Sequence, residues 1–239
     1  MSISAAISRI FNKSKIALPQ DCLLCAARAH VQPLCEACEQ ALPYHDAPAC
    51  PQCALATTAA RVCGECLRHP PVFDATLAAF DYRFPVDILV HQIKYHSNLA
   101  LVNFVANSLL RKLRNAEKPV LILAMPLHSA RLQQRGFNQS AEIAKQLTRL
   151  WSVPLQLDGY QRIRHTEEQA GLPWKERHAN VRGAFSCDLD LRGKHVAVID
   201  DVMTTGATLN EFASTLKKSG AEKISAYVVA RTLKKEFSI

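Results

Sequence analysis

The chain has 239 residues, of which 49% are hydrophobic, and a formal net charge of +8 at pH 7. This length suits one hydrophobic core with an appended small lobe, and no run of 18 apolar residues is present, so the sequence argues against a membrane-spanning helix. The positive charge favours an anionic partner, although two zinc ions held by four thiolates each would lower it to about +4.

The first 19 residues are basic and contain no acid, and Ile3, Ile7, Ile10 and Phe11 have helical spacing. Basic residues such as Arg9 interrupt the apolar stretch that a secretory signal needs. We therefore predict a frayed or docked N-terminal helix in a cytoplasmic protein. Peripheral association with a membrane surface, a partner helix and a transit-peptide role stay open.

Eight of the nine cysteines form four C-x-x-C pairs, and these pairs repeat along the chain. Each cysteine of the first half recurs 28 residues later (22 and 50, 25 and 53, 35 and 63, 38 and 66). This is the pattern of a tandem zinc ribbon. A cytoplasmic chain is kept reduced, which argues against a disulfide framework, and four pairs so close together argue against redox chemistry.

The simplest assignment gives each half of the repeat one structural zinc ion. The first set is Cys22, Cys25, Cys35 and Cys38, and the second set is Cys50, Cys53, Cys63 and Cys66. A crossed pairing uses the same ligands and stays open. The role of the ribbons is also open between nucleic-acid binding, protein binding and stapling of a small lobe. Cys187 lies near an expected strand, where we predict a packed thiol.

The composition changes after the cysteines, at Pro70 and Pro71, where we place a domain boundary. The predicted domains are an amphipathic segment at 1–19, a double zinc ribbon at 20–70 and a larger domain at 71–239. Beyond the boundary, strands and helices alternate with short connections. This alternation predicts an α/β fold with a mostly parallel sheet flanked by helices.

The elements of the larger domain follow from the apolar pattern. Strands are expected at 73–82, 120–125, 153–157, 196–199 and 224–230, helices at 86–95, 98–114, 138–151 and 207–218, and loops at 126–136 and 161–182. The predicted core faces of the two longest helices are Leu101, Val105, Leu109 and Leu113, and Ile143, Ala144, Leu147, Leu150 and Trp151.

The run VAVIDDVMTTGAT, residues 196–208, carries the clearest chemistry in the chain. A buried strand leads to Asp200 and Asp201, at the strand end where open α/β sheets bind ligands. The segment that follows, Thr204, Thr205, Gly206, Ala207 and Thr208, offers hydroxyls, close backbone approach and the amino end of a helix. A phosphate site with two carboxylates beside it, suited to vicinal hydroxyls, predicts a sugar 5-phosphate ligand.

This stretch resembles the phosphoribosyl pyrophosphate (PRPP) loop of type I phosphoribosyltransferases. The resemblance implies the fold of that class and PRPP with Mg²⁺ as the ligand. It implies that Asp200 and Asp201 hold the ribose hydroxyls and that residues 204–208 hold the 5-phosphate.

Other segments extend the resemblance to about residues 20–232. They are HQIKY at 91–95, PLH at 126–128 followed by RGFNQ at 135–139, and RHT at 164–166 followed by Gln169, Arg177 and NVRGAF at 180–185. With the C-x-x-C pairs they resemble the ComF family of competence and DNA-utilisation proteins. The resemblance implies a role in the uptake of single-stranded DNA during natural transformation, with an ATP-driven DNA translocase as partner.

The same resemblance gives further residues expected roles. Candidates for the pyrophosphate site and the flexible loop over it are Lys94, Pro126, Leu127, His128, Arg135, Arg164, Gln169 and Arg177. No side chain is a clear catalytic base, and His128 and His165 are candidates by location alone. Such a transfer depends mainly on Mg²⁺ and positioning, so the sequence leaves open whether the chain is an active enzyme.

The resemblance to these families implies two candidate functions. The first is a PRPP-binding competence protein that acts in the internalisation of single-stranded DNA, and the alternative is a metabolic phosphoribosyltransferase with a small nucleobase acceptor. The intact acid pair argues against a third, an adaptor with a silent site. The ribosyl acceptor, the oligomeric state and the DNA-binding surface stay open. The basic residues Lys217, Lys218, Arg231, Lys234 and Lys235 form either such a surface or a solvated face.

Overall fold

The computed structural model describes residues 20–29, 32–96, 98–164 and 181–233, so the predicted helix at 1–19 lies outside the described residues. The chain divides into two compact units, Met1–Leu42 and Pro43–Ile239. The boundary near residue 70 rests on motifs and stays a prediction. Within the described ranges, no helix is both long enough and apolar enough to cross a membrane.

The first unit is built around the first four cysteines. Its described elements are β1 (Gln20–Asp21), which pairs antiparallel with β2 (Arg28–Ala29), and α2 (Glu36–Gln40). The Cys22 amide donates to the Ala27 carbonyl at 2.7 Å, and Ala26 adopts a φ of +57° to close this knuckle. Cys35 then forms the N-cap of α2.

The second cysteine segment repeats this geometry within the second unit. The Cys50 amide donates to the Leu55 carbonyl at 2.7 Å, and Ala54 adopts a φ of +56°. Cys63 forms the N-cap of α3 (Gly64–Arg68). The 28-residue repeat of the sequence is therefore a repeat of backbone structure as well.

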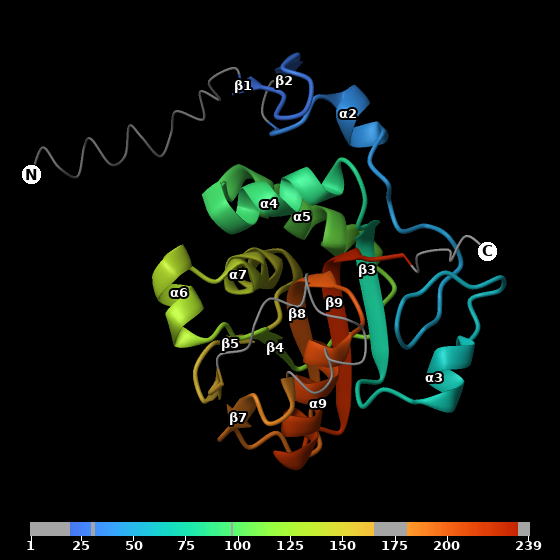
Figure 1. The fold of residues 1–239 in the computed structure, drawn as a ribbon, viewed down its shortest axis with the longest axis vertical. Helices are drawn as coiled ribbons and strands as arrows, with labels where there is room; N and C mark the ends of the chain where they lie inside the picture. Colours follow the sequence, from blue (N-terminus) through green and yellow to red (C-terminus); the bar gives the residue numbers. More distant parts are fainter. Residues whose placement is uncertain (1–19, 30–31, 97, 165–180, 234–239) are drawn as a thin grey trace, which may run out of the picture. The chain divides into compact units, whose positions relative to one another are not determined.

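A five-stranded parallel sheet forms the centre of the second unit (Figure 1). Its strands, in spatial order, are β3 (Ala75–Asp81), β9 (Lys223–Arg231), β8 (His195–Met203), β4 (Leu121–Ala124) and β5 (Leu155–Gln156). Every neighbouring pair runs parallel. The parallel sheet with flanking helices confirms the predicted fold class, and it places β8 in the middle with strands on both sides.

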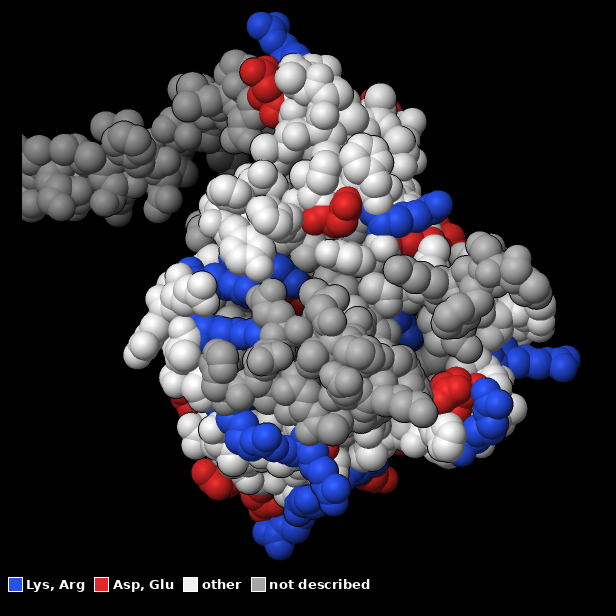
Figure 2. Space-filling view, in the orientation of Figure 1, with Lys and Arg blue, Asp and Glu red and all other residues white. Residues whose placement is uncertain are grey.

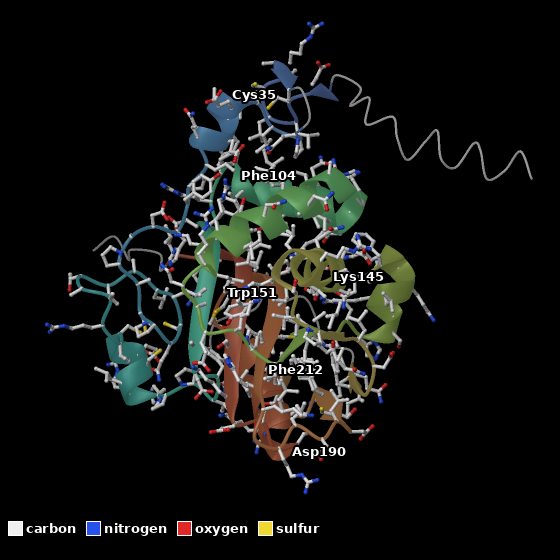
Figure 3. The ribbon with its side chains drawn as sticks, turned by 180° about the vertical axis from the view of Figure 1, so that it is seen from behind. Cys35, Phe104, Lys145, Trp151, Asp190 and Phe212 are labelled. Carbon is white, nitrogen blue, oxygen red and sulfur yellow. The ribbon has the colours of Figure 1, made fainter. Side chains whose placement is uncertain are left out.

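Helices from the first half of the unit cover one face of the sheet. They are α4 (Val86–His96), α5 (Leu99–Lys112) and α7 (Gln139–Trp151), and the short helix α6 (Ser129–Arg135) precedes α7. The helices α5 and α7 pack against each other and against the central strands. Phe104 of α5 stacks on Phe80 at 6.4 Å between ring centroids, and Trp151 of α7 meets Tyr227 edge-on at 5.8 Å (Figure 3).

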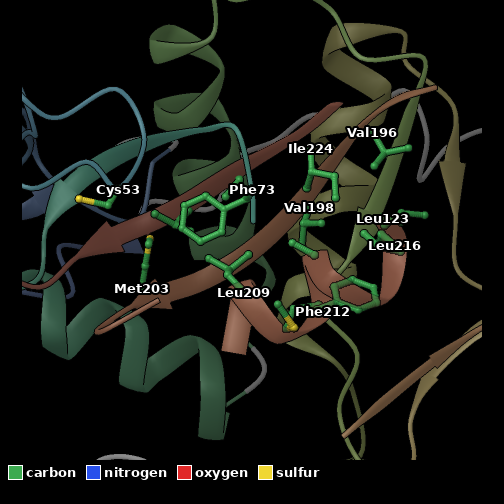
Figure 4. Close-up of a cluster of buried hydrophobic side chains, with 14 of the residues drawn as sticks. Cys53, Phe73, Leu123, Val196, Val198, Met203, Leu209, Phe212, Leu216 and Ile224 are labelled. Carbon is green, nitrogen blue, oxygen red and sulfur yellow. The ribbon is translucent and has the colours of Figure 1, made fainter. Parts of the chain in front are cut away.

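The opposite face is covered by α9 (Ala207–Lys218) and by a hairpin of β6 (Tyr160–Arg162) and β7 (Phe185–Cys187). Phe212 of α9 is fully buried, and its ring centroid lies 5.1 Å from that of Phe185. Together with Val196 and Val198 of β8 it forms the cluster shown in Figure 4. Cys187 packs against this cluster and is partly buried. This packing fixes α9, and therefore the loop before it, against the sheet.

Two predictions of local structure are wrong. Residues 126–136 were expected to form a loop, but α6 occupies most of this stretch and ends at Gly136, which has a φ of +78°. This helix lacks a buried residue, so it has no apolar stripe that the sequence would reveal. Leu150 was placed in the core but is 45% exposed, because it lies at the edge of the stripe that Ile143 and Leu147 centre.

Candidate functional site

The acid pair lies near the carboxyl end of β8. The strand continues four residues beyond its predicted end at Ile199, so the backbones of Asp200 and Asp201 belong to the sheet. Asp200 is 9% exposed and Asp201 is 7% exposed. Carboxylates buried to this degree require fixed polar partners.

Those partners come from two helices of the covering layer. From the first turn of α7, Ser140 Oγ donates to Asp200 Oδ1 at 3.1 Å and Gln139 Nε2 donates to Asp201 Oδ2 at 2.9 Å. From α4, Lys94 Nζ lies 3.1 Å from Asp201 Oδ2. The structure therefore brings the predicted residue Lys94 to the acid pair. Gln139 closes the RGFNQ segment that the sequence analysis singled out, and Ser140 follows it, but neither was assigned a role of its own.

The first turn of α7 is itself fixed by its cap. Asn138 Oδ1 accepts hydrogen bonds from the amides of Ser140 and Ala141, at 3.0 and 3.3 Å, and Asn138 Nδ2 donates to the Met125 carbonyl at 3.0 Å. This N-cap ties the helix start to the end of β4. The N-cap therefore fixes the backbone that positions Gln139 and Ser140.

A second cation reaches the acids indirectly. Arg135 Nη1 donates to Gln139 Oε1 at 2.9 Å, and its guanidinium lies over the Tyr95 ring at 5.1 Å from the centroid. Because Gln139 also donates to Asp201, the three side chains form a chain of hydrogen bonds. The predicted pyrophosphate residues Lys94 and Arg135 thus both lie on the Asp201 side of the site.

Burial dominates the electrostatics of Asp200. It raises the pKa of Asp200 to about 7, with further help from the neighbouring Asp201 charge. Burial by itself would lower the pKa of Lys94, but attraction to Asp201 and Asp200 outweighs it, so the pKa of Lys94 is raised. Lys94 therefore stays cationic at neutral pH, whereas Asp200 changes its charge near neutral pH.

The predicted phosphate loop follows directly and forms one wall of a small pocket of about 30 Å³. The pocket is lined by Asp200, Val202, Met203, Thr204, Gly206, Thr208 and Leu209. Thr205 Oγ1 accepts a hydrogen bond from the Ala207 amide at 3.2 Å, at the start of α9. The structure thus brings the first acid and three of the predicted phosphate-binding residues, Thr204, Gly206 and Thr208, around one hollow at the amino end of a helix.

Gly206 is the N-cap of α9 and has a φ of +82°. A Cβ at this position would lie 2.7 Å from Met203 Cε. We expect Gly206→Ala to lower the free energy of unfolding by about 1 to 2 kcal/mol, because an L side chain is strained at this φ and meets Met203 as well. Urea denaturation of the purified variant measures the change.

Gly193→Ala is the matched control for this substitution. Gly193 has a φ of +68° and no heavy atom within 4 Å of the added Cβ, so it isolates the backbone cost. A Gly206→Ala variant no less stable than Gly193→Ala would contradict the expected crowding against Met203.

Of the remaining predicted site residues, the structure describes some and leaves others outside the described ranges. Pro126, Leu127 and His128 follow β4, where His128 Nδ1 accepts from the Ala130 amide at 3.3 Å and caps α6. Arg164 donates to the Arg182 carbonyl, so the two ends of the predicted flexible loop meet. His165, Gln169 and Arg177 lie outside the described residues.

The cysteine sulfurs gather in two groups of four, and the atoms of each group lie within 4.8 Å of one another. The groups are Cys22, Cys25, Cys35 and Cys38, and Cys50, Cys53, Cys63 and Cys66, so the grouping is sequential rather than crossed. Four thiolates at this spacing fit tetrahedral zinc and leave no open position for a substrate. The two groups are therefore zinc-binding sites of the closed, structural kind.

The second cysteine group is built into the core of its unit. Cys50, Cys53 and Cys66 are buried and belong to the hydrophobic cluster that also contains Phe73 and Met203. The segment that leads to them also lies along β3, where the Thr76 amide donates to the Pro51 carbonyl at 3.0 Å and the Asp81 amide to the Pro43 carbonyl at 2.8 Å. It thus protects an edge strand of the sheet.

Of the basic residues that the sequence suggested as a surface group, Arg231 does not belong to a surface. Arg231 lies in β9 and is only 3% exposed, so its assignment to a basic surface is wrong. Lys217 pairs with Asp74 at 3.2 Å, and Lys234 and Lys235 lie outside the described residues. Figure 2 shows Lys and Arg side chains at several separate places on one face of the second unit. On this face, the positive charge therefore does not select one nucleic-acid-binding patch.

Comparison with known protein families separates the cysteine-rich part of the chain from the part that carries the acid pair. A family model described as a phosphoribosyl transferase domain matches residues 95–239. A second, described as a double zinc ribbon domain, matches residues 14–67. The first covers the acid pair and the phosphate loop, and the second covers both cysteine groups.

Curated relatives match over most of the chain. DNA utilization protein YhgH of Escherichia coli O157:H7 is 32% identical over 207 residues, which cover 84% of this chain and 91% of that protein. Competence protein F of Haemophilus influenzae is 31% identical over 222 residues, covering 88% and 96%. Competence protein ComFC of Bacillus subtilis is 23% identical over 213 residues, covering 83% and 84%.

Proposed function

This chain belongs to the ComF family of competence and DNA-utilisation proteins, with a phosphoribosyl transferase domain and a double zinc ribbon. On that premise, we propose that it binds PRPP with Mg²⁺ and acts in the internalisation of single-stranded DNA. One observation carries the ligand: the buried acids Asp200 and Asp201 stand beside the phosphate loop that opens α9. The proposed location is the cytoplasm.

The acid pair suits the sugar of such a ligand. Ionised carboxylates accept hydrogen bonds from vicinal hydroxyls, and carboxylate oxygens are also the donors that Mg²⁺ prefers. Hydroxyl donors favour the charged form of a carboxyl group, so a bound ribose would lower the pKa of Asp200 from about 7. Ser140 and Gln139 already hold the two carboxylates in place.

The flanking residues suit the two ends of the ligand. Residues 204–208, at the amino end of α9, would hold the 5-phosphate through hydroxyls and backbone amides. Lys94 and Arg135 would contact the diphosphate, which would draw Lys94 away from Asp201. Mg²⁺, when bound, supplies charge that offsets the diphosphate. Arg164, Gln169 and Arg177 belong to the segment that the resemblance assigns to a closing loop, and they are proposed to complete the enclosure.

The cellular role rests on the relatives. Proteins named for DNA utilisation and competence match nearly the full length of the chain. We propose that single-stranded DNA is a direct ligand and that an ATP-driven translocase is the partner. A salt titration of oligonucleotide binding, followed by fluorescence anisotropy, tests the first part. Affinity should fall steeply as salt rises if phosphates are contacted, and absent or salt-insensitive binding would remove DNA as a direct ligand.

The alternative function is a metabolic phosphoribosyl transfer to a small nucleobase. The match to a phosphoribosyl transferase domain and the complete acid pair favour it. The discriminating measurement is release of diphosphate from PRPP in the presence of each common nucleobase. Turnover with one base would establish the metabolic reaction, and PRPP binding without turnover would favour a binding role.

Isothermal titration with PRPP and Mg²⁺ tests the proposed site directly. The full-length, zinc-loaded protein should bind, and the double variant Asp200→Ala with Asp201→Ala should lose binding by more than about 100-fold, because two hydrogen-bonding charges are removed. The matched control is Asp188→Ala with Asp190→Ala, which removes two exposed acids of the same unit. Equal binding by both double variants would contradict the site, and no binding by the folded wild type would contradict PRPP as the ligand.

A further inference from the structure

Arg231, the last residue of β9, is a buried cation. Among the described residues, no carboxylate lies within ion-pair distance of its guanidinium, which is unusual for a charge that is 97% covered. Its hydrogen-bond partners are instead mostly backbone carbonyls. A buried guanidinium needs compensation from somewhere, and its neighbours show where it is found.

The guanidinium joins two segments that are far apart in the sequence. Arg231 Nε donates to the Cys53 carbonyl at 2.7 Å, within the second zinc knuckle. Arg231 Nη1 donates to the Met203 carbonyl at 3.0 Å and to the Thr204 carbonyl, at the start of the phosphate loop. One rigid planar group thus ties the zinc knuckle to the phosphate loop.

The next residue strengthens the loop side of this junction. The Thr232 amide donates to the Met203 carbonyl at 3.1 Å. Met203 in turn packs beneath the loop, since its Cε would lie 2.7 Å from a Cβ on Gly206. Figure 4 shows Met203, Phe73 and Cys53 within one cluster. The knuckle, Arg231 and the loop are therefore a single packed assembly.

The charge that balances Arg231 comes from the cysteine group. Four thiolates with one zinc ion carry a net charge of about −2. Arg231 Nε contacts this group directly, through the Cys53 carbonyl at 2.7 Å. The second zinc centre is therefore the negatively charged group that lies beside this cation.

We propose that Arg231 is a positioning residue that couples the second zinc site to the phosphate loop. The thiolate centre holds the guanidinium in place, and the guanidinium fixes the carbonyls of Met203 and Thr204 so that residues 204–208 keep the geometry a phosphate needs. Loss of this zinc, or of Arg231, loosens the loop even though neither contacts the ligand. The identity of the ligand rests on the proposed function, but the coupling itself does not.

The test is a thermodynamic cycle on the full-length protein. The variants are Arg231→Met, Cys63→Ser and the two combined, with Arg231→Lys as a milder change. Hydrogen exchange of peptides covering residues 203–208 reports the loop without any ligand, and titration with PRPP and Mg²⁺ reports the site. Cys35→Ser, in the first cysteine group, and Arg192→Met, whose arginine is exposed, are the matched controls.

Each single variant should speed exchange in the loop and weaken PRPP binding by about 10-fold or more, and the double variant should be little worse than the worse single variant, since both changes break one linkage. Arg231→Lys should fall between Arg231→Met and the wild type, because it keeps the charge but loses the fork. The controls should stay within about twofold.

Three results would overturn the coupling: native-like loop exchange in folded Arg231→Met, fully additive effects in the double variant, or an equal loss in Cys35→Ser. If Arg231→Met does not fold, Arg231→Lys decides by the same exchange measurement. If the wild type binds no PRPP while the exchange cycle behaves as expected, the proposed function fails and the coupling stands.

Discussion

At neutral pH the Asp200→Asn protein should be more stable than the wild type by about 1 to 3 kcal/mol, while its affinity for PRPP falls. Asp200 is a buried carboxyl whose pKa is raised from its ordinary value of 3.8 to about 7. Its Oδ1 accepts hydrogen bonds from Ser140 Oγ and from the Asp201 amide. An asparagine oxygen can accept the same two hydrogen bonds, and the substitution removes the buried charge, so it relieves the cost of burying that charge.

The expected pH dependence follows from the direction of this shift. Between about pH 4 and pH 7 the folded protein holds a proton on Asp200 that the unfolded chain has released. The free energy of unfolding contributed by this group therefore falls as pH rises through that window, and the loss is complete above the folded-state pKa. The advantage of Asp200→Asn should be small near pH 4.5 and largest near pH 7.5. Paired urea titrations at several pH values measure the difference.

Asp190→Asn is the control for this prediction. Asp190 is exposed and bonded to Arg192 at 2.7 and 2.9 Å, and these hydrogen bonds lower its pKa. Its replacement should change stability little, and any change should have the opposite sign. An Asp200→Asn protein less stable than the wild type at pH 7.5 would mean that Lys94 fully compensates the buried charge. The native Asp200 would then not lower the free energy of unfolding, and no trade-off between stability and function would exist at this position.

The fold was predictable where the apolar period was strong. Leu101, Val105 and Leu109 mark the buried face of α5 as expected. The sheet followed from short apolar runs such as 196–199, although β8 continues through Asp200 to Met203 because neighbouring strands, not local propensity, decide where it ends. The helix α6 was missed because it buries no side chain and so leaves no periodic signal.

The site was predictable only where its residues lie close together in the sequence. The order of acids, threonines and glycine in residues 200–208 is a local pattern, and the structure places Asp200, Thr204 and Gly206 around one pocket. The contact of Gln139 with Asp201 joins residues 62 positions apart, and no local pattern encodes it. Arg231 was misassigned for the same reason, since its partners Cys53 and Met203 come from distant segments.

The positions of Gln139 and Ser140 depend on how α7 is seated, and Leu147 is the side chain that should reveal this most strongly. Leu147 is fully buried, on a helix that packs against α5, β4 and β8. We expect Leu147→Ala to lower the free energy of unfolding by about 2 to 5 kcal/mol, through lost burial and the cavity left behind. Urea denaturation followed by circular dichroism measures the loss.

Leu150→Ala is the matched control, because it makes the same substitution three residues later on the same helix. Leu150 is 45% exposed, so its removal should change stability by less than about 0.5 kcal/mol, and alanine's helix propensity offsets part of any loss. Equal losses in the two variants would mean that Leu150 faces the core, as the apolar pattern alone suggested. A large loss in Leu147→Ala alone would establish that the buried stripe of α7 centres on Ile143 and Leu147. The amino end of the helix, with its two hydrogen bonds to the acid pair, would then be held by packing a full two turns away.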